Sequence, residues 1–154
     1  MTKFLLSLHV LAAIIAVGPV AVAASMFPKA LRRAHEDAEG AASPRLLYRV
    51  CRVYAGVGIA VPVFGFATAS NMGVLGSAWL ITAIGLTAVA AGVLALWILP
   101  AQHAALEGLD DAAAGGVGVA KVAARLGAAT GVFNLLWATV TVLMIVRPGS
   151  TTGA

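Results

Sequence analysis

The chain has 154 residues, of which 61% are hydrophobic and 10% charged, and its formal net charge is +4. A soluble domain carries about 25% charged residues, so this composition excludes a water-soluble globular domain. The high apolar content also excludes an intrinsically disordered chain, and a single cysteine, Cys51, excludes a disulfide-linked scaffold. The composition therefore indicates an integral membrane protein.

Four apolar blocks without Asp, Glu, Lys or Arg predict four membrane-spanning helices. The first block, residues 4–27, is about 36 Å long as a helix, enough to cross a hydrocarbon core of about 30 Å. It resembles a signal peptide, but it is longer than a typical signal-peptide core, so we expect it to be retained. No block alternates apolar with polar residues as barrel strands do. We predict an all-α, four-transmembrane-helix bundle in one domain, 1–154, with helices at about 4–27, 44–72, 78–99 and 117–146.

Prolines and glycines suggest where these helices bend and end. Gly18-Pro19 predicts a kink within the first helix, and Ser43-Pro44 is a favourable start for the second. Pro28 and Pro100 follow the first and third apolar blocks, so we expect those helices to end there. A short surface helix over residues 101–109 and a flexible linker would then lead to the fourth span.

The distribution of basic residues predicts the orientation. Eight of the ten lie in the connection between the first two helices or in that between the last two, and only Lys3 and Arg147 lie on the other side. The positive-inside rule assigns the basic side to the cytoplasm. Both termini are therefore expected to face outward.

His9 is an ionisable residue within the first span, about 8 Å from its outer end. One reading is a haem or metal ligand, with Met72 or Met144 near the same surface as a second ligand. The other is a hydrogen bond to a backbone carbonyl, a serine or a threonine of a neighbouring helix. We favour the second reading, since a single histidine with distant methionines is a weak metal signature.

Basic residues also form an ordered stripe. Arg45, Arg49 and Arg52 are spaced i, i+4 and i+7, which places them on one face of a helix. Together with Lys29, Arg32 and Arg33 they would make a basic collar at the inner leaflet. The collar is either a binding site for an anionic lipid headgroup or an acidic partner, or simply the charge that sets the topology.

Small residues recur in pairs at the spacing that lets membrane helices pack closely. The pairs are Gly127 and Gly131, Ala88 and Gly92, and Gly56 and Ala60. Asn134 lies in the same predicted helix as Gly127 and Gly131, and we expect its side chain to hydrogen-bond to another helix.

The segment Ser7-Leu8-His9-Val10-Leu11-Ala12-Ala13-Ile14-Ile15, followed by Gly18, resembles the opening of a family of four-helix bacterial integral membrane proteins of unknown function. That family is distantly similar to the copper-resistance D-type membrane proteins and to the membrane-embedded bacterial protoporphyrinogen oxidases, whose first helix also bears a histidine. The resemblance implies a four-helix fold and a place in the bacterial inner membrane.

Three hypotheses for the function follow. The first is a non-enzymatic accessory or assembly subunit of a larger membrane complex, for example a respiratory one, with no cofactor. The alternative is a haem-binding redox protein or oxidase using His9. A small-solute transporter ranks last, because the apolar blocks contain no carboxylate to carry protons. Expected partners are anionic lipids and other membrane subunits or a second copy, and not nucleic acid.

Overall fold

Four long columns of helix make up the protein. The computed structural model describes residues 1–37, 42–110 and 116–149, and every regular element within those ranges is a helix. The elements are α1 (Thr2–Glu36), α2 (Ala42–Val57), α3 (Ala60–Met72), α4 (Ala78–Gly92), the π-helix η2 (Val93–Ile98), α5 (Leu99–Asp110) and α6 (Gly116–Val146).

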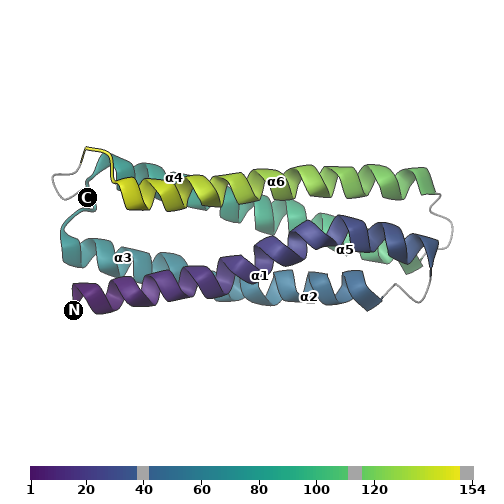
Figure 1. The fold of residues 1–154 in the computed structure, drawn as a ribbon, viewed down its shortest axis with the longest axis horizontal. Helices are drawn as coiled ribbons and strands as arrows, with labels where there is room; N and C mark the ends of the chain where they lie inside the picture. The colour runs from purple at the N-terminus through teal and green to yellow at the C-terminus, as the bar shows by residue number, and fades with distance from the viewer. Residues whose placement is uncertain (38–41, 111–115, 150–154) are drawn as a thin grey trace.

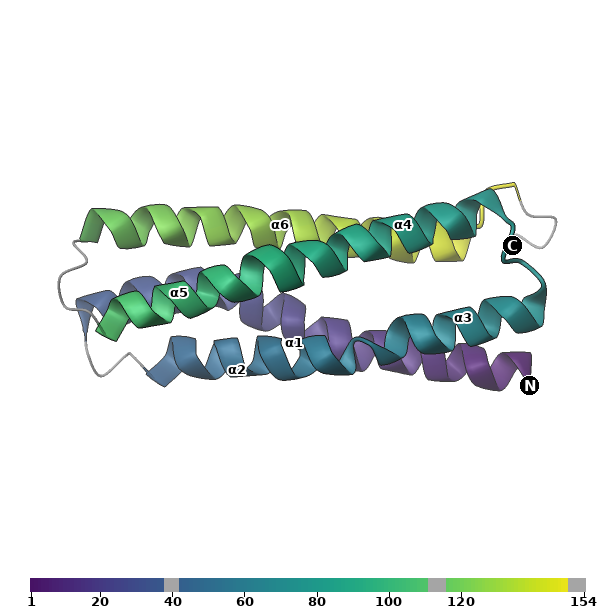
Figure 2. The same cartoon turned by 180° about the vertical axis from the view of Figure 1, so that it is seen from behind.

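Four stretches are long and apolar enough to cross a membrane: Thr2–Glu36, Ala42–Met72, Ala78–Leu109 and Gly118–Val146. They lie lengthwise beside one another, with the start of α1 and the end of α6 at the same end (Figures 1 and 2). The opposite end, where α1 and α5 finish and α2 and α6 begin, is called the basic end here because it carries most of the basic residues. The predicted all-α bundle of a multi-pass membrane protein is confirmed.

Two of the predicted helix ends are wrong. α1 continues through Pro28 to Glu36, and the third span continues through Pro100 to Asp110. A proline removes one helical hydrogen bond, but the buried faces persist beyond it, with Leu31 on α1 and Leu106 on α5 both buried. The packing of these buried faces stabilises each helix by more than the missing hydrogen bond at its proline costs. α1 does change direction along its length, as the Gly18-Pro19 pair predicts (Figure 1).

The predicted second span over residues 44–72 is present as Ala42–Met72, but its helix is broken at Gly58 and Ile59. Pro62 has no N–H to donate to the carbonyl of Gly58, four residues earlier, and its ring would crowd that carbonyl. The Gly58 carbonyl instead accepts from the backbone N–H of Val61 at 3.1 Å. The result is a separate α3 that begins at Ala60 and packs beside the first half of α1.

The third span contains a π-helical segment that keeps one face toward the core. Its buried residues recur every four positions, and in a regular α-helix such a row would rotate by about 40° at each step. The wider turn of η2 reduces this drift. The row consists of Ala90, Leu94, Ile98, Gln102 and Leu106.

The core lies where α1 and α6 face the other spans. Buried positions alternate in steps of four and three on α1 and recur in steps of three, four and seven on α6, the spacing of a left-handed helix bundle. Alanines dominate on α1, so neighbouring helices can approach it closely, and Phe27 and Phe133 fill the centre. The buried rows are Ala16, Val20, Ala23, Phe27, Ala30 and Ala34 on α1, and Ala123, Leu126, Thr130, Phe133 and Val140 on α6.

Candidate functional site

His9 makes a polar contact between two spans. Its half-buried ring places Nδ1 2.9 Å from the backbone carbonyl oxygen of Val61 on α3. Since a carbonyl only accepts, Nδ1 carries the proton and donates it, while the carbonyl keeps a second lone pair for the helix. The predicted contact with a backbone carbonyl of a neighbouring helix is confirmed.

Gly65 makes room for this ring, and it was not among the residues predicted from the sequence. A Cβ atom built at Gly65 would lie 3.0 Å from Cε1 and 3.2 Å from Nδ1 of His9. Val61 and Gly65 are one helical turn apart, so the ring lies across the face that both present to α1. The available signal was a glycine within an apolar span, which often marks a close approach between helices.

The bonding of His9 determines what its other nitrogen can do. With Nδ1 donating, Nε2 of the neutral ring is left with a lone pair, the arrangement usual for a metal-binding histidine. The structure brings no group of three His, Cys, Asp or Glu side chains together as metal ligands within the described ranges. Met144 packs against the apolar cluster that contains Trp79 and Leu80.

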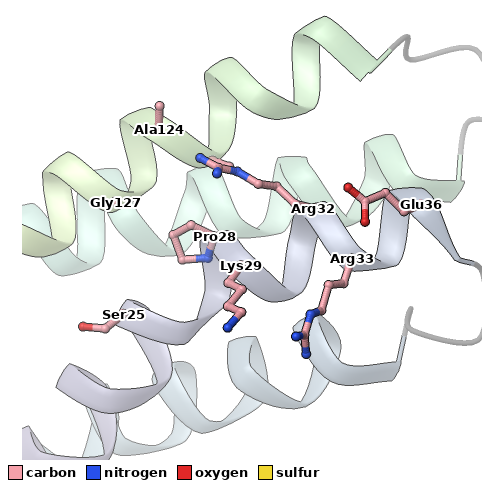
Figure 3. A pocket seen from close by; sticks show the side chains of 9 residues that line it. Ser25, Pro28, Lys29, Arg32, Arg33, Glu36, Ala124 and Gly127 are labelled. Atoms are coloured by element: carbon pink, nitrogen blue, oxygen red, sulfur yellow. The ribbon is translucent and has the colours of Figure 1, made fainter.

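A groove between α1 and α6 divides the predicted basic collar. Lys29, Arg32 and Arg33 line it, while Arg45, Arg49 and Arg52 lie exposed on α2 and do not. Figure 3 shows these α1 side chains with small residues of α6 across the groove. It has a volume of about 530 Å³, and its lining is Ser25, Pro28, Lys29, Arg32, Arg33, Glu36, Ala123, Ala124 and Gly127.

Of the small residues predicted to pack helices, Gly127 is in contact with another helix. A Cβ there would lie 3.9 Å from Cγ of Pro28 on α1. At Gly56, Gly92 and Gly131 an added Cβ would meet no atom within 4 Å. Ala88, which is paired with Gly92, is exposed, and Ala60, which is paired with Gly56, is half-buried. Most of these positions are therefore open to a molecule outside the chain.

Polar side chains tie the spans together. Gln102, fully buried on α5, donates from Nε2 to Sγ of Cys51 at 3.8 Å, and that sulfur approaches the carbonyl of Val20 on α1 at 4.0 Å. The sequence placed Gln102 on a surface helix, which is wrong because the third span continues past Pro100. Asn134 donates to Oγ of Ser25 on α1 at 3.2 Å, as predicted for an interhelical donor.

Comparison with family models, with curated proteins and with solved structures finds no match to this chain. The resemblance of the first span to a four-helix bacterial family therefore stays a prediction. The function is inferred from the geometry of His9, the α1/α6 groove and the outward small residues.

Proposed function

We propose that the protein is an accessory or assembly subunit, without catalysis of its own, of a larger complex in the bacterial inner membrane. The observation that carries this proposal is that Gly56, Gly92 and Gly131, on three different spans, present open backbone outside the bundle. Within a membrane, helices associate through close packing at small residues, because lipid leaves no hydrophobic driving force between them. Small residues that pack against nothing inside the chain are available to a helix of another subunit.

The use of His9 inside the bundle supports the same proposal. Its Nδ1 donates a hydrogen bond to the backbone carbonyl of Val61. This bond joins α1 to α3 and stabilises the fold. A polar group left unpaired in an apolar environment costs a few kcal/mol. The histidine therefore has a structural reason to be present without any cofactor.

Co-purification in mild detergent from native membranes tests the proposal. We expect a stoichiometric partner with the wild-type chain, and at least tenfold less of it with Gly92→Leu or Gly131→Leu, because a bulky side chain blocks helix approach. Gly76→Leu is the control, since an added Cβ at Gly76 also meets nothing within 4 Å but Gly76 lies in the turn between α3 and α4, off the faces of the spans. The absence of any stoichiometric partner, or an equal loss with Gly76→Leu, would contradict the proposal.

A haem-binding redox protein is the second candidate, and one observation favours it. The bond from Nδ1 of His9 to a backbone carbonyl orients the ring and leaves Nε2 as the ligating atom. An absorption spectrum of the purified protein separates the two candidates. A Soret band that disappears in His9→Ala supports haem, whereas the accessory role predicts an unchanged visible spectrum and a lower melting temperature in that variant.

A further inference from the structure

The groove between α1 and α6 has a charged part and an apolar part along one axis. Lys29, Arg32 and Arg33 contribute three positive charges and Glu36 one negative charge, which leaves an excess of two positive charges. On the α6 side the lining is only Ala123, Ala124 and Gly127. The groove thus offers cations beside a smooth apolar surface.

The basic side chains leave α1 in two directions. In Figure 3, Arg32 extends toward α6, while Lys29 and Arg33 extend from the opposite side of α1, and Pro28 lies between these two directions. Lys29, Arg32 and Arg33 are all exposed. The charged group of Arg32 can therefore meet an anion between α1 and α6 while it keeps contact with water or headgroups, and Lys29 and Arg33 add positive charge nearby.

The groove also extends along the axis of α1, the direction in which a lipid lies in a membrane. Ser25 and Glu36 mark its two ends on α1, and eleven helical residues span about 16 Å. Glu36 is at the basic end of the bundle and Ser25 lies further along α1 toward the middle of the bundle (Figure 3). An amphipathic molecule can place its charge near Arg32 and its chain beside Gly127.

We propose that this groove binds an anionic glycerophospholipid of the leaflet at the basic end, with its phosphate at Arg32, in the positive field of Lys29 and Arg33, and one acyl chain over Ala124 and Gly127. A lipid fits better than a free anion because charged and apolar linings are continuous and both belong to a membrane-spanning pair of helices. This inference is independent of the accessory role. It moves the predicted lipid site away from the Arg45, Arg49 and Arg52 stripe.

Titration of the detergent-purified chain with defined lipids, followed by native mass spectrometry, tests the charge requirement. We expect cardiolipin and phosphatidylglycerol to bind at least tenfold more tightly than phosphatidylethanolamine, with doubly charged cardiolipin the tightest. Arg32→Gln should weaken cardiolipin binding about fivefold, the effect of one basic residue at an anionic surface. Arg49→Gln is the matched control, an exposed arginine at the same end but outside the groove, and should bind as the wild type does.

Two further measurements test whether the bound phosphate belongs to a lipid or is a free anion. Gly127→Leu should weaken cardiolipin binding at least fivefold by filling the apolar part, whereas Gly92→Leu, on another span and outside the groove, should not. Inorganic phosphate at millimolar concentration should not displace the lipid.

Three outcomes would overturn the inference: equal binding of neutral and anionic lipids, equal loss in Arg49→Gln and Arg32→Gln, or displacement by inorganic phosphate. If Gly127→Leu does not fold, the arginine pair decides alone, since both side chains are exposed and their replacement disturbs no packing.

Discussion

Replacing Phe27 with alanine is expected to lower the free energy of unfolding by about 3 kcal/mol. The side chain is completely buried on α1 and belongs to the cluster that also contains Ile98, Leu126 and Phe133. Removing the ring leaves a cavity that the surrounding helices cannot close, because each contributes to other contacts. The surrounding lipid does not reduce this cost, because the substitution removes packing and dispersion contacts inside the bundle rather than a contribution from transfer out of water.

The measurement is unfolding of the purified protein in mixed detergent, followed by circular dichroism. Leu135→Ala is the matched control on the same bundle, because Leu135 is 70% exposed and faces away from the core. Its free energy of unfolding should change by less than about 0.5 kcal/mol. Equal destabilisation by the two substitutions would contradict the proposed core.

Replacing Gly65 with leucine is expected to destabilise the protein by about 2 kcal/mol through overpacking. The first added carbon would already lie 3.0 Å from Cε1 of His9, so the ring must shift, and we expect the rest of the leucine side chain to push it away from the carbonyl of Val61. The expected loss combines steric strain with a broken, half-buried hydrogen bond. Gly85→Leu, where an added Cβ meets nothing within 4 Å, should leave the melting temperature nearly unchanged.

A double-mutant cycle shows whether His9 is the cause. In the His9→Ala background the ring is absent, so Gly65→Leu should cost at least 1 kcal/mol less than it does in the wild type. Additive losses from the two substitutions would mean that His9 and Gly65 do not contact each other. The melting temperature in detergent is the readout for all four proteins.

Hydropathy was sufficient to predict the four spans, because burial of a long apolar segment in a membrane is decided by that segment alone. The same holds for the clustering of basic residues at one end. Proline was a less reliable guide. Pro28 and Pro100 follow apolar blocks and yet lie within helices, because buried residues continue beyond them. Pro62 does accompany a break, because it has no N–H to donate to the carbonyl of Gly58.

The sequence by itself determined the all-α class, the number of spans and the need of His9 for a polar partner outside its own helix. The residues three and four positions from His9, which share its face, are Leu5, Leu6, Ala12 and Ala13, and none of these carries a polar side chain. The tertiary structure alone decided that the partner is the Val61 carbonyl, that Gly65 must lack a side chain, and that Arg32 rather than Arg49 lines a groove. These features depend on which helix packs against which and at what rotation. That choice is made by packing between segments far apart in the sequence, which no local pattern encodes.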